Sequence, residues 1–313
     1  MKRTVTGSCL AVLLGAAALL LVLFPQRESK SWVIPVMGTV CECKFELDGG
    51  DQQEALKAVN EAFAEVMEIA NLYDQNSELS RLNASAHLNP FVCSDKLYTL
   101  LCESRKAYEL SCGSFDISVK PLMDLWGFYR KQGEIPPAPD IAKAGQLCGL
   151  DKVIFNDAER SVYFPHKGMA LDLGGIAKGF ALDLAVEKLA AKGVSVRRGM
   201  INLGGNIYLL GKGQSYRIGI KDPSNPEVIK EVITLNAPGA VSSSGDYERF
   251  VILEGKKFGH IIDPATGSPA TRSYAATVFA SSGIKSDWMS TTLYLRGKES
   301  ANRLDCQSWI VEK

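Results

Sequence analysis

Three side chains near the C-terminus have the types and the spacing of a divalent-metal site. Asp287, Ser290 and Thr291 stand at positions i, i+3 and i+4 of an expected helix, so a carboxylate and two hydroxyl groups share one helical face. Carboxylate and hydroxyl oxygens are hard ligands, of the kind that Mg²⁺ uses when it keeps waters and binds substrate phosphates. The competing interpretation is a helix with one charge near its N-terminus and two small packing residues.

A second segment, Leu171–Gly179 with the sequence LDLGGIAKG, is expected to join a strand to the N-terminus of a helix. Backbone N–H groups and the positive end of the helix dipole attract anions there, and Lys178 adds a point charge. The glycine spacing matches neither the P-loop nor the dinucleotide fingerprint. The segment therefore indicates either an anion site or an ordinary strand–turn–helix junction.

Three further segments combine glycine with polar side chains. Ile201–Ile207 places two glycines inside an expected strand, where glycine usually marks a bulge or the close approach of another group. Val241–Tyr247, with the sequence VSSSGDY, is expected to be a hydroxyl-rich turn. In Gly259–Gly267, His260 precedes a turn at Asp263 and is either a general base, a donor to phosphate or, as most lone histidines are, a structural residue.

The elements that must position these residues follow from the hydrophobic pattern. Helices are expected over 51–71, over 95–108, from Gly175 to about Lys192 and over 286–295. The segments 72–83 and 127–142 are polar or proline-rich and are expected to be turns and loops. Strands are expected at 32–45 with a break at Met37-Gly38, and at 153–155, 161–164, 169–173, 200–210, 216–221, 232–235, 250–253, 257–262 and 274–280. Because helices and strands interleave without a regular βαβ rhythm, we expect an α+β fold, with one large domain over 31–313 that packs helices on mixed or antiparallel sheets.

The composition excludes two classes of protein. The chain has 313 residues, 46% apolar and 22% charged, so it is long enough and apolar enough to bury a core and is not a disordered protein. Its 35 Lys and Arg balance 35 Asp and Glu, which gives no overall attraction to a polyanion. We therefore expect no nucleic-acid partner, and an anion must be bound at a local site.

Residues 1–30 are expected to lie outside the folded domain. Lys2 and Arg3 precede an apolar run, Leu10–Phe24, which is the pattern of a signal peptide or a membrane anchor. No clear cleavage site follows the run, which favours an uncleaved anchor, and Cys9 precedes the run, which argues against a lipid-modified cysteine. The pattern predicts that residues 31–313 function outside the cytoplasm.

Taken together, these segments resemble the FAD:protein FMN transferase family, also called the ApbE flavin transferases. The resemblance is collinear over about residues 32–297 and also includes Met37-Gly38-Thr39, Tyr73, SELSRLN at 77–83, GSFD at 113–116 and WGF at 126–128. It implies an ApbE-like fold related to the T-fold. It also implies a reaction in which Mg²⁺ assists the splitting of the FAD pyrophosphate, FMN is esterified to a threonine hydroxyl of a target protein, and AMP is released.

The resemblance implies a role for individual residues as well. The FAD site would be lined by Met37, Tyr73, Ser114, Phe115, Asp116, Asp172, Lys178 and Ile262. The metal ligands would be the backbone carbonyl of Gly175 and the side chains of Asp287 and Thr291, with Ser290 where other members have a second carboxylate. His260 is the candidate catalytic residue that orients or deprotonates the acceptor threonine.

The same resemblance implies partners and a location. The targets of the family include subunits of membrane redox complexes, so we expect a protein held at the bacterial inner membrane by residues 1–30, with its catalytic domain on the periplasmic side. Two alternatives stay open. One is an Mg²⁺-dependent FAD pyrophosphatase, in which water replaces threonine; the other is a flavin-binding lipoprotein without turnover, which Asp287 and Thr291 disfavour because simple binding needs no metal ligands.

Overall fold

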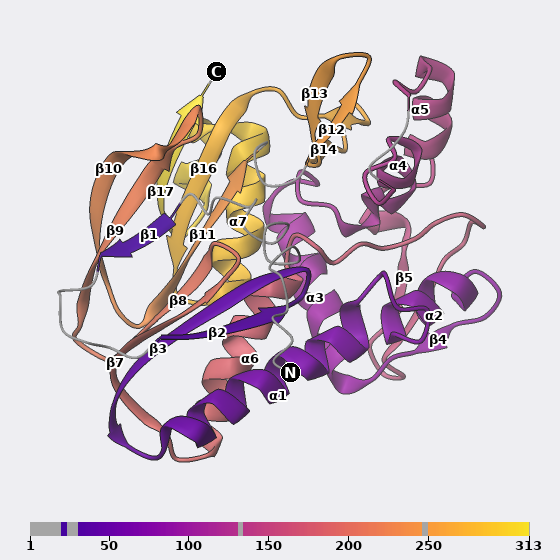
Figure 1. Ribbon diagram of the computed structural model, residues 1–313. Coiled ribbons are helices and arrows are strands. Elements are labelled where there is room, and N and C mark those ends of the chain that lie inside the picture. The colour runs from indigo at the N-terminus through magenta and orange to yellow at the C-terminus, as the bar shows by residue number, and fades with distance from the viewer. Residues whose placement is uncertain (1–19, 24–30, 131–133, 246–249, 313) are drawn as a thin grey trace, which may run out of the picture.

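The computed structural model describes residues 20–23, 31–130, 134–245 and 250–312 (Figure 1). It confirms the predicted α+β class, since a seven-stranded antiparallel sheet carries helices on one face and a smaller sheet on the other. The strand order of the large sheet is β17-β16-β11-β8-β7-β3-β2. Its strands are β2 (Ser31–Val36), β3 (Thr39–Gly49), β7 (Ser195–Leu203), β8 (Asn206–Leu210), β11 (Gly239–Gly245), β16 (Ser273–Ala280) and β17 (Gln307–Glu312).

Alternating side chains of the large sheet build two hydrophobic cores. Ile201 of β7 and Tyr208 of β8 face the helices, whereas Met200 and Leu209 face the smaller sheet. The helix layer consists of α1 (Gln52–Ala70), α6 (Ala177–Ala191) and α7 (Gly283–Arg296), each within a few residues of its predicted range. Figure 1 shows α7 against the middle of the sheet, with α6 and α1 below it.

The smaller sheet has the order β1-β9-β10, with β1 (Leu20–Leu23), β9 (Ser215–Asp222) and β10 (Asn225–Asn236). Strand β1 comes from the apolar run that the sequence predicts to be a signal or anchor, and it pairs antiparallel with β9. The rest of that run lies outside the described residues. Within the described part of the chain, no helix is long and apolar enough to cross a membrane.

The remaining elements form a lobe beside α7 (Figure 1). They are α2 (Glu78–Ser85), β4 (Phe91–Val92), α3 (Asp95–Leu110), α4 (Lys120–Leu125), α5 (Ala138–Gly145), β5 (Ile154–Asn156), β6 (Ser161–Tyr163), β12 (Phe250–Leu253), β13 (Lys256–Gly259), β14 (Ile262–Asp263) and β15 (Ser268–Pro269). A small apolar cluster around Leu122 and Trp126 joins α4 to the β12–β15 segment. The indole N–H of Trp126 donates to the carbonyl of Gly267 at 2.9 Å, which fixes this segment on α4.

Two glycine- and serine-rich segments differ from their predictions. The segment VSSSG, predicted as a turn, belongs to the interior strand β11, where its three serines hydrogen-bond at 2.7–2.8 Å to hydroxyl groups of α7 and β16. Asp246 and Tyr247, which follow in the same motif, lie outside the described residues. Gly204 and Gly205 do not interrupt a strand; both have positive φ, 57° and 94°, and form the tight turn between β7 and β8.

Other local differences concern short elements. Helix α2 begins inside the segment predicted to be turns, where the Ser77 hydroxyl accepts the Ser80 N–H at 3.1 Å and caps the helix. Helix α5 begins at Ala138 within the predicted loop 127–142. The segment 169–173 is not a strand, and β17 follows the helix that was predicted to close the chain. The predicted break at Met37-Gly38 is confirmed as the turn of the β2–β3 hairpin.

Replacing Tyr216 by phenylalanine tests how the two sheets are held together. The buried Tyr216 hydroxyl accepts the Gly199 N–H at 2.7 Å and lies 2.7 Å from the Leu210 carbonyl, so it links β9 to β7 and β8. We expect Tyr216→Phe to lower the free energy of unfolding by about 1–3 kcal/mol, because a buried backbone N–H loses its partner. Urea unfolding measures the change.

Tyr163→Phe provides the matched control, since Tyr163 is only partly buried and lies on β6, away from the contact between the two sheets. We expect this change to alter the free energy of unfolding by less than about 0.5 kcal/mol. Equal effects of the two variants would contradict the role assigned to the Tyr216 hydroxyl.

Candidate active site

Helices α6 and α7 meet at two glycines without an intervening side chain. A Cβ atom added to Gly179 would lie 2.2 Å from the carbonyl oxygen of Gly283, and one added to Gly283 would lie 2.3 Å from the carbonyl oxygen of Gly179. At this crossing the Gly179 N–H donates to Oδ2 of Asp287 at 2.8 Å. The contact therefore brings Asp287, which is 5% exposed, to the first turn of α6.

The predicted metal ligands lie close together at this crossing. An added Cβ at Gly175 would lie 3.8 Å from Oγ1 of Thr291, so the loop before α6 and the middle of α7 are neighbours. The Thr291 hydroxyl in turn lies 3.2 Å from Oγ of Ser244 on β11. The region thus gathers a carbonyl, a hydroxyl and a carboxylate oxygen, a donor set that suits Mg²⁺ bound with waters or phosphates.

Ser290 stands apart from this group because its hydroxyl has other partners. It is fully buried, donates to the carbonyl of Asp287 at 2.8 Å and lies 2.8 Å from Oγ of Ser244. These contacts link α7 to β11. Among the described residues, no group of three or more His, Cys, Asp or Glu side chains is arranged to hold a metal. A cation at this site would therefore depend on Asp287 together with hydroxyl and main-chain oxygens.

The predicted flavin-site residue Asp172 organises the loop before α6. Its Oδ1 accepts the Gly174 N–H at 2.7 Å, its Oδ2 accepts the hydroxyl of Tyr129 at 2.5 Å, and its own N–H donates to the carbonyl of Ile117 at 2.7 Å. Burial, and then the charge of Asp172, raise the pKa of Tyr129, so its phenol stays a hydrogen-bond donor. The Tyr73 ring is 70% exposed and stands edge-on to Tyr129, with 6.4 Å between the ring centroids.

The segment Ser114–Asp116 packs between this loop and α7. Ser114 Oγ accepts Nε–H of Arg296 at 2.5 Å, and the Phe115 ring lies against Gly175 and 6.3 Å from the ring of Trp288. Asp116 is only 8% exposed and accepts both the N–H and the hydroxyl of Ser118, while burial raises the pKa of its carboxyl. The buried Ser114 and Asp116 side chains therefore hold the loop that carries Phe115.

Met37 and Lys178 lie at two other edges of the region. Met37 has a positive φ of 51° in the β2–β3 turn, and the Gly204 N–H donates to the Val40 carbonyl at 3.1 Å, so the β2–β3 and β7–β8 turns are adjacent. Lys178 is half-buried in the first turn of α6. Lys178 thus lies at the helix N-terminus that the sequence predicts to be either an anion site or an ordinary strand–turn–helix junction.

His260 and Ile262 belong to the segment that packs on α4. Ile262 is buried in the cluster of Leu122 and Trp126, and His260 is half-buried in the bend between β13 and β14. Tyr129, whose hydroxyl binds Asp172, also packs against this cluster, so the β12–β15 segment and the loop before α6 meet at Tyr129. The prediction treats the residues of both segments as one site.

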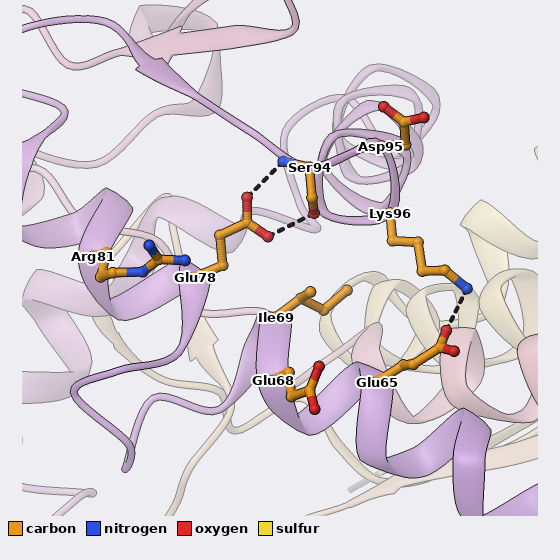
Figure 2. Close-up of a pocket in the computed structure, with 8 residues that line it drawn as sticks. All are labelled: Glu65, Glu68, Ile69, Glu78, Arg81, Ser94, Asp95 and Lys96. Carbon is orange, nitrogen blue, oxygen red and sulfur yellow. Dashed lines mark hydrogen bonds and ion pairs between the residues drawn. The ribbon is translucent and has the colours of Figure 1, made fainter.

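An open hollow of about 460 Å³ lies elsewhere, between α1, α2 and α3 (Figure 2). Four of its polar side chains pair with one another: the Glu78 carboxylate accepts the N–H and the hydroxyl of Ser94 at 2.6 Å each, and Lys96 pairs with Glu65. None of the predicted site residues lines it. These contacts stabilise the start of α3, and we assign the hollow no chemistry.

Several residues of the region are absent from the sequence predictions. Tyr129 and Arg296 contact predicted residues, yet nothing in their local pattern marks them. Ser244 belongs to the VSSSGDY segment noted in the sequence, but no role is predicted for it there. Gly179 lies four residues before an aspartate, as Gly283 lies four residues before Asp287. This shared spacing indicates a contact between the two segments only when the crossing of α6 and α7 is already known.

The chain is similar to known proteins in both sequence and fold. Residues 37–308 match the sequence model of the ApbE family. A FAD:protein FMN transferase from Haemophilus influenzae is 31% identical, over 96% of this chain and 89% of its own. Among solved structures, the ApbE protein from Thermotoga maritima has a TM-score of 0.83 at 27% identity, covering 91% of this chain and 94% of its own. The flavin transferase ApbE from Vibrio cholerae has a TM-score of 0.75 at 26% identity, covering 91% and 97%.

Adding a methyl group at the helix crossing tests its close packing. We expect Gly283→Ala to lower the free energy of unfolding by about 1–3 kcal/mol, because the new Cβ overlaps the Gly179 carbonyl and forces α6 and α7 apart. Gly145→Ala is the matched control: this helical glycine in α5 has no atom within 4 Å of an added Cβ, so alanine there should stabilise slightly. Thermal unfolding of both variants measures the difference in stability. If the Gly283→Ala protein is as stable as the Gly145→Ala protein, the close contact of α6 and α7 at Gly283 is not as described.

Proposed function

The chain belongs to the ApbE family, and we propose that it is an Mg²⁺-dependent FAD:protein FMN transferase that modifies a threonine hydroxyl of a target protein. The observation that carries the proposal is the placement of Thr291 beside Gly175 and of Asp287 beside Gly179, both at the N-terminus of α6. This is where hard oxygen ligands and a helix end can meet the diphosphate of FAD.

The proposed reaction is a displacement at phosphorus. The acceptor hydroxyl oxygen forms a bond to the phosphorus on the FMN side, the bond from that phosphorus to the bridging oxygen breaks, and AMP leaves with that oxygen. Mg²⁺, when bound by the Gly175 carbonyl, Asp287 and Thr291, supplies charge neutralisation on the phosphate oxygens. Lys178 and the backbone N–H groups at the start of α6 add positive potential at the same place.

Recognition of the flavin falls to the residues around Asp172. The Tyr73 ring is exposed but is supported edge-on by Tyr129, whose hydroxyl is held by Asp172, so it offers a flat apolar surface to an isoalloxazine or adenine ring. Phe115 packs under Gly175 and keeps the loop close to α7. We assign Met37, Ser114, Asp116 and Ile262 to the surroundings of the FAD, as the family resemblance implies.

His260 is our candidate for handling the proton of the acceptor threonine. Its half-buried ring lies in the bend after β13, on the segment held by α4, and an imidazole near neutral pH can accept or orient a hydroxyl proton. Ser290 has no part in the proposed metal set, because its hydroxyl is taken by Ser244 and by the carbonyl of Asp287.

A transfer assay tests the proposal directly. The purified chain is incubated with FAD, Mg²⁺ and a target domain that contains the acceptor threonine of the family, and covalent flavin is detected by its fluorescence after denaturing electrophoresis. We expect a fluorescent target band and one AMP per flavin attached, both lost when Mg²⁺ is chelated or the threonine is replaced by alanine. AMP and free FMN without labelled target would instead identify a pyrophosphatase, and FAD binding without any turnover would identify a binding protein.

Within that assay, Asp287→Asn separates metal binding from folding. The amide oxygen can still accept the Gly179 N–H, but the charge that attracts the cation is lost, so we expect the transfer rate to fall at least about 100-fold at fixed Mg²⁺. Asp222→Asn at the end of β9 is the matched control, with the same chemical change at a site remote from α7. Equal rates for the Asp287→Asn protein and the wild type would refute the metal assignment.

We further propose that residues 1–30 hold the enzyme at the bacterial inner membrane, with the catalytic domain on the periplasmic side and membrane redox-complex subunits as targets. The support is the pair Lys2 and Arg3 before the apolar run Leu10–Phe24. Because Leu20–Leu23 of this run form β1 in the folded domain, the anchor of the proposal is the part that precedes β1. We expect the full chain to sediment with membranes and to be digested by protease added to spheroplasts. A chain found only in the cytosolic fraction would overturn the proposal.

A further inference from the structure

The crossing of α6 and α7 is reciprocal. Gly179 and Asp183 on α6 have the same four-residue spacing as Gly283 and Asp287 on α7. Asp183 accepts the N–H groups of Gly283 and Ile284 at 2.6 and 2.9 Å, while Asp287 accepts the N–H of Gly179 at 2.8 Å. Each helix thus binds the backbone of the other through an aspartate, and we call these four residues and their hydrogen bonds the aspartate–glycine clasp.

The clasp caps α7 from a neighbouring helix. Ser282, the residue before α7, accepts only the Lys285 N–H, at 3.3 Å, through its side chain. The first two N–H groups of the helix are bound by Asp183 instead, so the start of α7 is tied to one place along α6. Because Asp287 and Thr291 follow on the next two turns of α7, a shift of this end moves both relative to Gly175.

The ionised form of Asp183 lowers the stability of the folded protein. Burial raises its pKa to about 6, the charge of Glu103 adds to the rise, and the two N–H groups from α7 offset only part of it. The folded protein therefore holds this proton more tightly than the unfolded chain, which means that ionisation of Asp183 at neutral pH lowers the stability of the fold. A buried charge that lowers stability but orients a functional helix is common at active sites.

We propose that Asp183 is a positioning residue for the metal site, holding α7 on α6 so that Asp287 and Thr291 stay within reach of the Gly175 carbonyl. The inference depends on the proposed function for its metal, but it assigns a role to a residue on α6 that is neither one of the proposed Mg²⁺ ligands nor one of the residues assigned to the FAD site. In this proposal Asp183 sets the geometry of the metal site, whereas Gly175, Asp287 and Thr291 supply the oxygen ligands.

The test compares Asp183→Asn with the wild type in the full chain. Asparagine keeps one acceptor oxygen but loses the charge and the second acceptor, so we expect the stability at pH 7.5 to change little while the clasp loosens. The Mg²⁺ concentration for half-maximal transfer should rise about 10-fold or more, with FAD saturating. The affinity for Mn²⁺, measured by electron paramagnetic resonance with FAD present, should fall by a similar factor. This measurement does not depend on turnover.

Two further variants keep the outcome interpretable. Ser94→Ala removes an N-cap of the same kind from α3, far from the site, and should lower the melting temperature while leaving Mn²⁺ affinity unchanged. Asp183→Glu restores the charge on a longer side chain and should recover part of the Mn²⁺ affinity lost in Asp183→Asn. Wild-type Mn²⁺ affinity in Asp183→Asn would overturn the proposal. A loss of Mn²⁺ affinity in Ser94→Ala as large as that in Asp183→Asn would overturn it as well, because the loss would then follow from lowered stability alone.

The failure of the proposed function is distinguishable from the failure of this inference. A wild-type chain that binds Mn²⁺ but transfers no flavin would refute the transferase proposal, and the Mn²⁺ affinities of the variants would still decide the role of Asp183. A wild-type chain that binds no divalent cation in the presence of FAD would refute the positioning role itself.

Discussion

The close contact of α6 and α7 is the constraint on which the site and much of the fold depend. A backbone N–H of one helix reaches a carboxylate of the other only because Gly179 and Gly283 place no side chain between them. The same contact sets the position of α7 on the sheet. Ser286 and Ser290, four residues apart on α7, can then meet the hydroxyls of Ser242 and Ser244 on β11, each at 2.8 Å.

The interface between α7 and β11 is consequently polar at the centre of the molecule. Buried hydroxyl groups are costly unless each has a partner, and here the serines of β11 pair with α7 on one side of the strand and with Thr277 of β16 on the other. A slip of one residue would replace these pairs with hydroxyl groups facing apolar atoms. We infer that the hydroxyl pairs give the helix a unique register on the sheet, which purely apolar contacts specify less strictly.

The proposed flavin surface is built on loops that this rigid layer holds. The Asp172 loop is joined to Ser114–Asp116 through the Ile117 carbonyl, and that segment is joined to the end of α7 through Arg296. Loops held in this way expose residues such as Tyr73 without losing their geometry. The segment that carries His260 is anchored through Trp126 and the apolar cluster on α4. Tyr129 packs on that cluster and binds Asp172, so it joins the two parts of the proposed site.

The sequence by itself determined the elements whose signals are local. Apolar spacing predicted the helices α1, α3, α6 and α7, the Met37-Gly38 pair predicted a hairpin turn, and helical periodicity placed Asp287 and Thr291 on one face. Tertiary structure alone decided that VSSSG belongs to an interior strand, because the hydroxyl partners of its serines lie 34 to 46 residues away along the chain. It also decided which backbone groups Asp183 and Asp287 bind, about 100 residues away in each case. A pattern confined to neighbouring residues carries no information on such contacts, since they form only when distant segments pack together.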